Sequence, residues 1–170
     1  MRSLIQYFLL ALLLLLVQVL VLSNIHLGNI ATPFLYIWLI LKLPNDMGRP
    51  MVITIAFLMG LAVDLFANTP GMHALASSFL GFMKEPLMVL YVPREDIKTG
   101  VASVKLMGMG GYLRFLGTAV LLFCASVYII EAFTFFNLGL LALKIITSSV
   151  LTFLLIAGLD GLRPVKASAV

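Results

Sequence analysis

Four ionisable side chains lie within or against long apolar runs of this sequence: Asp64, Lys84, Glu85 and Lys144. A charge near the centre of a bilayer costs about 2.5–3.5 kcal/mol on insertion scales, so each of them needs a partner or access to water. Lys84 and Glu85 are adjacent and close to the end of their run, where a long side chain can reach the interface. Asp64 and Lys144 are therefore the stronger candidates for a polar site inside a bundle.

Asp64 follows Ala56 and Gly60 at intervals of four residues, so its carboxylate shares a helix face with two small residues. Membrane helices approach closely along such faces, which directs Asp64 inward. His73 lies at a similar depth just beyond the turn at 68–71, and we expect Asp64 and His73 to be hydrogen-bonded. The pair could be a proton relay, a ligand contact or half of a catalytic dyad. We favour a buried carboxylate that holds the hairpin together, because catalysis needs a nucleophile, a base and a stabilising group in one place.

Ser77 and Ser78 are the nearby candidates for a nucleophile. However, Ala74, Ser78 and Gly81 recur at the spacing of a small-residue packing face, which explains serine in a membrane helix without chemistry. An acid and a histidine are too few ligands for a metal site, and the single cysteine, Cys124, allows no thiolate cluster. We expect no catalytic, cofactor or metal site, and the chain is predicted not to be an enzyme.

Lys144 begins a second polar face, which continues through Ser148 and Thr152. Such a face should point inward or toward another protein helix, not toward lipid. Glu131, at the end of the preceding apolar run, is the expected partner of Lys144, and Asp64 is the alternative. An interhelical ion pair is the interpretation we favour, and a polar cavity opening to the outer side is the functional one.

Composition indicates where these residues must lie. Of 170 residues, 62% are hydrophobic and 11% charged, and the mean hydropathy is +1.16. Soluble domains carry about 25% charged residues, so lipid must solvate part of this chain. Its basic residues are scattered between apolar runs, which argues against nucleic-acid binding. The pattern predicts an all-α membrane protein, a single domain over 1–170 forming a six-transmembrane-helix bundle, with spans at about 4–22, 30–43, 51–67, 72–90, 113–130 and 138–159.

Two of these spans have unusual features. Thr32 and Pro33 suit the start of a helix, which leaves the second span about 11 residues, too short for a hydrocarbon core of about 30 Å. Either that span is short, or 25–32 enters the membrane as irregular chain shielded by protein. Pro86 should kink or end the fourth helix near Glu85.

The positions of Lys and Arg predict the orientation. The connections at 23–32, 68–71 and 131–137 contain neither residue, whereas the opposite side carries nine. Because cytoplasmic loops are enriched in Lys and Arg, both termini are predicted to be cytoplasmic. The nine are Arg2, Lys42, Arg49, Arg94, Lys98, Lys105, Arg114, Arg163 and Lys166.

The sequence GLAVDL at 60–65, followed by GMHAL at 71–75, resembles the signature of the rod shape-determining protein MreD family. That signature is G-L-x-x-D-L at the end of one span, a short loop, and G-x-x-A-L at the start of the next. Pro33, Trp38 and the Leu-Pro pair at 43–44 also fit, as do the length and the number of spans.

The resemblance implies a bacterial inner-membrane protein with a fold similar to the substrate-binding subunits of energy-coupling-factor transporters. It further implies a non-catalytic scaffold or regulatory subunit of the lateral cell-wall synthesis complex. Such a subunit binds MreC and helps to organise RodA and a class B penicillin-binding transpeptidase alongside the MreB filament. It marks Asp64 and Gly71 without giving either a catalytic role. The alternative is a substrate-binding subunit of a vitamin-type transporter, with a pocket lined by Asp64, His73 and Lys144.

The small-residue faces at 56–60 and 74–81 flank one turn and can pack on each other, which removes them from the surfaces free for a partner. The fifth span offers Gly117 and Leu121 instead. We therefore hypothesise that a partner helix docks there, with the connection at 87–112 helping.

Overall fold

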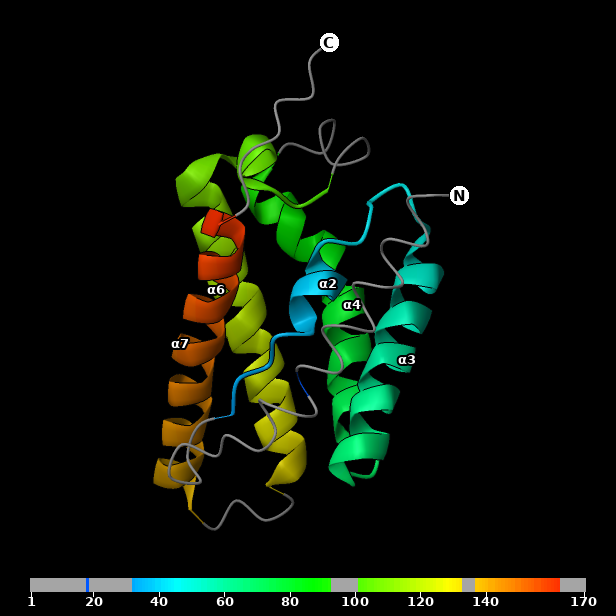
Figure 1. The fold of residues 1–170 in the computed structure, drawn as a ribbon, viewed down its shortest axis with the longest axis vertical. Coiled ribbons are helices and arrows are strands. Elements are labelled where there is room, and N and C mark those ends of the chain that lie inside the picture. The colour runs from blue at the N-terminus through cyan, green and yellow to red at the C-terminus, as the bar shows by residue number, and fades with distance from the viewer. Residues whose placement is uncertain (1–17, 19–31, 93–100, 133–136, 163–170) are drawn as a thin grey trace.

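The structure, a computed structural model, describes residue 18 and residues 32–92, 101–132 and 137–162. Its described elements are all helices: α2 (Ile37–Leu41), α3 (Arg49–Ala67), α4 (Met72–Tyr91), α6 (Val104–Glu131) and α7 (Leu138–Leu162). Figure 1 shows α2 in the middle, between the pair α3 and α4 on one side and the pair α6 and α7 on the other. The predicted all-α class is confirmed for the described part of the chain.

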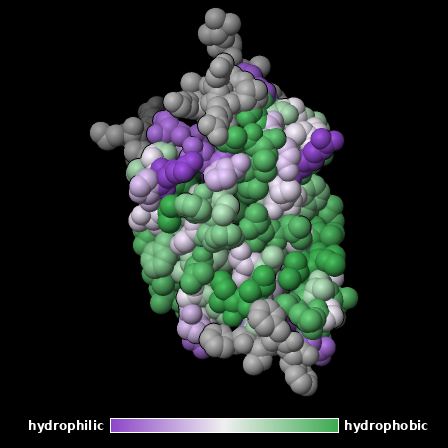
Figure 2. All heavy atoms as spheres, turned by 180° about the vertical axis from the view of Figure 1, so that it is seen from behind, coloured by the Kyte–Doolittle hydropathy of each residue, from purple (hydrophilic) through white to green (hydrophobic). Residues whose placement is uncertain are grey.

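Three helices, α3, α6 and α7, are long and apolar enough to cross a membrane. Their outward side chains include large apolar groups such as Leu65, which is 76% exposed, and Phe66, which is 71% exposed. Figure 2 shows that apolar side chains cover the middle of one face, with polar ones gathered toward both ends. This distribution suits contact with lipid tails and identifies a membrane protein. The first predicted span, 4–22, lies outside the described residues except for Gln18.

The second predicted span differs from expectation. Its helix begins at Ile37, not at Pro33, and α2 has only five residues, all of them buried. Residues 32–36 form no helix, so their backbone needs other partners. Gln18 supplies two: its Nε2 donates to the carbonyl oxygen of Pro33 at 2.8 Å, and its Oε1 accepts from the N–H of Leu35 at 2.8 Å. Non-helical backbone at membrane depth is tolerated where protein satisfies it in this way.

The other helix boundaries depend on single residues. α4 continues through Pro86 to Tyr91, so the expectation that it could end near Glu85 is wrong, while the predicted span 72–90 agrees with its bounds. α6 begins at Val104, nine residues before the predicted span at 113–130. Gly108 interrupts it with φ 70° and ψ 165°, a conformation that glycine adopts readily. Residues 104–112, predicted as part of the connection at 87–112, therefore belong to α6 and lie on both sides of the break at Gly108.

Aromatic side chains fill the centre of the bundle. Phe34 lies edge-on to Phe123 and Tyr128, with ring centroids 5.4 and 6.3 Å apart. Tyr36 lies edge-on to Phe123 at 5.8 Å. Such edge-to-face pairs add about 0.5–1.5 kcal/mol to the burial of the rings. The non-helical segment is thus held through its side chains as well as its backbone.

Candidate functional site

Asp64 lies one turn before the end of α3 and is 4% exposed. Its Oδ1 accepts hydrogen bonds from the backbone N–H of His73 at 3.0 Å and from Thr69 Oγ1 at 2.6 Å. Its Oδ2 accepts from the N–H of Ala74 at 2.8 Å. His73 and Ala74 belong to the first turn of α4, whose N-cap residue, Gly71, has no side chain to offer. Asp64 therefore caps α4 from the preceding helix, with its negative charge at the positive end of the helix dipole.

The hydrogen bond predicted between Asp64 and His73 is present, but its donor is the backbone amide of His73, not the imidazole. With three donors around it, the carboxylate of Asp64 is satisfied within its own hairpin. This geometry agrees with the structural interpretation of Asp64.

The turn between the two helices uses two left-handed residues. Asn68 has φ 54° and Gly71 has φ 76°. Asparagine tolerates this region better than most residues, and glycine enters it at no steric cost. The N–H of Gly71 also donates to the carbonyl oxygen of Thr69 at 2.8 Å. A glycine at 71 is thus required by the backbone path that brings the start of α4 under Asp64.

Gly60 lies where α3 and α4 come closest. A Cβ atom at this position would lie 2.4 Å from the carbonyl oxygen of His73 and 2.6 Å from Cα of Ala74. Both are backbone atoms, so a side chain here would force the helices apart. Further along the same helix pair, a Cβ at Gly81 on α4 would lie 3.1 Å from Cβ of Ala56 on α3. The predicted packing of the two small-residue faces on each other is confirmed.

The side chain of His73 points to Tyr36. The hydroxyl of Tyr36 lies 3.5 Å from Nδ1 of His73 and 3.0 Å from Oγ of Ser77, and all three residues are buried. Ser77 thus meets the tyrosine hydroxyl and not the imidazole. Ser78, the other candidate nucleophile, donates to the carbonyl oxygen of Ala74 at 2.8 Å, within its own helix. In the described segments, no group of three or more His, Cys, Asp or Glu residues could hold a metal ion.

Lys144 pairs with Glu131, as predicted from the sequence. The distance from Nζ to Oε1 is 3.2 Å, and the ammonium also lies 5.8 Å from the ring centroid of Tyr128. Asp64, the alternative partner, is occupied with its helix cap. Both side chains of the ion pair are partly exposed, which limits its contribution to about 0–1 kcal/mol.

The polar face that continues from Lys144 points inward. Oγ of Ser148 accepts from the N–H of Thr32 at 3.0 Å, and Oγ1 of Thr152 accepts from the N–H of Phe34 at 3.0 Å. The hydroxyl of Tyr128 lies 2.6 Å from the same Ser148 oxygen. The sequence predicted the direction of this face correctly. It did not predict the partner, because the need for acceptors arises only once 32–36 is known to be non-helical.

Two adjoining cavities lie at this end of the bundle. The larger, of about 400 Å³, is lined in part by His73, Thr32 and Phe34. The smaller, of about 230 Å³, is lined in part by Lys144. Tyr128 and Glu131 line both. Of the three residues proposed to line one transporter pocket, His73 and Lys144 thus face different cavities, and Asp64 faces neither.

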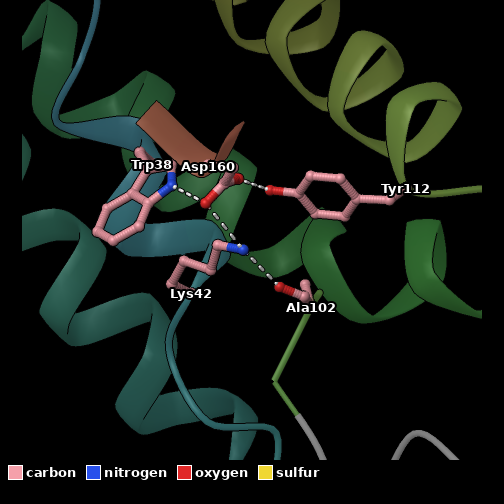
Figure 3. A network of polar contacts seen from close by, with 5 residues as sticks. All are labelled: Trp38, Lys42, Ala102, Tyr112 and Asp160. Carbon is pink, nitrogen blue, oxygen red and sulfur yellow. Dashed lines mark hydrogen bonds and ion pairs between the residues drawn. The ribbon is translucent and has the colours of Figure 1, made fainter. Parts of the chain in front are cut away.

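Sequence reasoning missed a polar cluster at the opposite end of the bundle. Asp160, near the end of α7, accepts a hydrogen bond from Nε1 of Trp38 at 3.0 Å and another from the hydroxyl of Tyr112. Nζ of Lys42 lies 3.3 Å from the same carboxylate and donates to the carbonyl oxygen of Ala102 at 3.0 Å. Figure 3 shows these groups converging from α2, α6, α7 and the segment before α6.

This cluster ties three helices and a connecting segment together. Lys42 also lies over the ring of Tyr112, with Nζ 4.6 Å from its centroid. Each residue alone looks like an ordinary interfacial side chain. The available signal was Asp160, an acid that directly follows the last apolar run and therefore needs donors nearby.

The predicted docking position on the fifth span is only partly on the surface. A Cβ at Gly117 would lie 3.9 Å from the ring of Phe153, so this glycine faces α7 of the same chain. Leu121, one turn further along α6, is 49% exposed. Of the two residues, Leu121 is therefore the one available to another helix.

No protein-family model, curated protein or solved structure matches the chain.

Proposed function

We propose that this chain is a non-catalytic scaffold or regulatory subunit of the bacterial rod-shape complex, an MreD-like protein of the inner membrane. In this role it binds an MreC-like partner and helps to organise RodA and a class B penicillin-binding transpeptidase, with the MreB filament connected indirectly. The proposal rests on the resemblance of 60–65 and 71–75 to the family signature.

The observation that carries the proposal is the structural role of the signature residues. Gly60 permits the close approach of two helices, Asp64 caps the second helix, and Gly71 makes the turn. All three residues stabilise the hairpin of α3 and α4. This is what we expect of a signature in a scaffold protein, which needs a fixed shape to bind its partners. The apolar surface of α6 supplies area that a partner helix can cover, and Leu121 is part of it.

The test is co-purification of an MreC-like protein with the tagged chain from native membranes. Leu121→Trp should reduce the co-purified partner at least about threefold while leaving the abundance of the chain unchanged, since Leu121 is exposed. Leu154→Trp is the matched control, because Leu154 is an exposed leucine on α7. Gly117→Leu is a poor choice, since the new side chain would contact Phe153 inside the protein.

Failure of the unaltered chain to retain an MreC-like protein would contradict the proposed function. Equal recovery with both tryptophan variants would exclude only the docking position.

A substrate-binding transporter subunit is the second candidate, and the cavity of about 400 Å³ favours it. Small-molecule sites have volumes of about 300–1,000 Å³ and a few polar groups among apolar ones. Mass spectrometry of the purified chain separates the two functions, because a transporter subunit would retain a vitamin-sized compound and a scaffold would not.

A further inference from the structure

Lys84, on α4, is a buried lysine without a negatively charged partner. It is 3% exposed, and its Nζ donates to the carbonyl oxygen of Leu43. Among the described residues, the ion pairs within 4 Å are Lys42 with Asp160, Arg49 with Glu85, and Lys144 with Glu131. Lys84 takes part in none of them. A buried ammonium that lacks an opposite charge carries a large desolvation cost, which a bound anion would offset.

This lysine lines a cavity of about 340 Å³. The other lining residues come from the start of α3, the loop before it and α4. Val52 on α3 and Gly81 on α4 line it as well, together with residues 44–48 before α3. The volume falls in the range of about 300–1,000 Å³ that small-ligand sites have. The cavity therefore has room for a headgroup or a small anion next to Lys84.

The start of α3 adds a second positive element to the same cavity. Gly48, its N-cap residue, makes no side-chain cap, and the first turn contains no acidic residue. The partial positive charge of this helix end is therefore not neutralised by its own sequence. Gly48 and Arg49 both line the cavity, so this helix end and Lys84 face the same space.

The two acidic residues that line the cavity, Asp46 and Glu85, do not neutralise the charge of Lys84. Glu85 is paired with Arg49, so its charge is already compensated. Asp46 is an exposed loop residue and lies beyond ion-pair distance of Lys84. The innermost charge of the cavity is thus the ammonium.

We propose that this cavity binds a phosphate group, with the phosphate oxygens accepting from Nζ of Lys84 at the positive end of α3. The same chemistry is offered by the headgroup of an anionic phospholipid and by a soluble phosphate. The proposal is independent of the rod-shape function, because it concerns the opposite end of the α3–α4 pair from the signature turn.

The test is native mass spectrometry of the purified full chain titrated with phosphatidylglycerol and, separately, with phosphatidylcholine. The chain should bind phosphatidylglycerol in preference, and Lys84→Met should weaken that binding about tenfold or more, the effect of one charge-assisted hydrogen bond. Lys105→Met is the matched control. Lys105 is an exposed lysine on α6 that does not line the cavity, and its removal should leave binding unchanged.

Arg49→Gln provides a second variant whose folding is safe, because Arg49 is exposed. It removes one positive charge from the lining of the cavity, so it should also weaken binding. Competition by inorganic phosphate at millimolar concentration would identify a soluble ligand, and absence of competition would identify the lipid. Equal binding of both lipids without competition by inorganic phosphate, or equal phosphatidylglycerol binding by the Lys84 and Lys105 variants, would overturn the proposal. If Lys84→Met does not fold, unchanged binding by Arg49→Gln overturns it instead.

Discussion

Asp64 joins the end of one helix to the start of the next. Both of its oxygens accept from backbone amides of α4, and one also accepts from Thr69. An ordinary N-cap side chain comes from the residue that starts its own helix. Here glycine at 71 occupies that position for the sake of the turn, and the acceptor comes from another helix.

This arrangement predicts different effects for two substitutions of Asp64. Asp64→Leu removes every acceptor and should destabilise the hairpin by about 2–4 kcal/mol, since two buried N–H groups lose their partner. Asp64→Asn keeps one oxygen and should cost about 1–2 kcal/mol, in the range of a weakened cap. Protein level in membranes and thermal unfolding of the purified variants measure both. Asp64→Asn with normal abundance but no recovery of an MreC-like partner would show a functional role for the carboxylate.

The limits of sequence reasoning at this scale are illustrated by Asp64 and His73. The four-residue spacing of Ala56, Gly60 and Asp64 was enough to predict that the carboxylate points into the bundle and lies near the next helix. Side-chain types alone favour an imidazole donor, because they carry no information about which backbone amides lack a partner. That information depends on the left-handed conformation of Gly71, which sets where α4 begins.

Among the helices, the short α2 and the non-helical residues before it depend most on the rest of the chain. The N–H of Phe34 reaches Thr152 on α7, and its neighbours are bonded to Gln18. Thr32 and Pro33 form a sound start signal for a helix, which is why the sequence predicted one. Gln18, Ser148 and Thr152 outweigh that local preference, and partners so distant along the chain cannot be inferred from a local motif.

Thr152→Val tests this dependence. Valine has nearly the shape of threonine but no acceptor, so the buried N–H of Phe34 would be left without a partner at a cost of about 1–3 kcal/mol. Thermal unfolding should show the loss. Thr54→Val is the control, because the Thr54 hydroxyl is exposed and bonds only to Pro50 of its own helix. Equal stability of the two variants would mean that Thr152 does not hold the segment.

At the scale of the whole molecule, the apolar middle and polar ends of the face in Figure 2 indicate how the described helices lie in a bilayer, and the distribution of Lys and Arg predicts which end is inside. The turn at 68–71 and the start of α7 lie at one end, and the loop before α3 lies at the other. The three helices able to span a membrane were each predicted within a few residues at one end or both. The break at Gly108 was missed because residues 104–112 were predicted as connecting chain and not as helix.

Labelling of single cysteines measures the orientation. Cysteines at Pro70 and Asn137, both exposed, should react with a membrane-impermeant maleimide in intact cells, and a cysteine at Asp46, exposed at the opposite end, should not. The native Cys124 is fully buried and gives no background. Reaction at Asp46 together with protection at Asn137 would reverse the orientation.

The hydrogen bond between Phe34 and Thr152 also constrains the order in which the protein is completed. A ribosome delivers residue 34 long before residue 152, which lies 118 positions later. Throughout that interval the amides of Thr32 and Phe34 lack the acceptors that α7 brings. Exposing such amides to lipid costs several kcal/mol each, so the nascent segment has to wait at the interface or inside the insertion machinery. Among the described helices, the one synthesised last is therefore the one that allows an early part of the chain to take its place in the membrane.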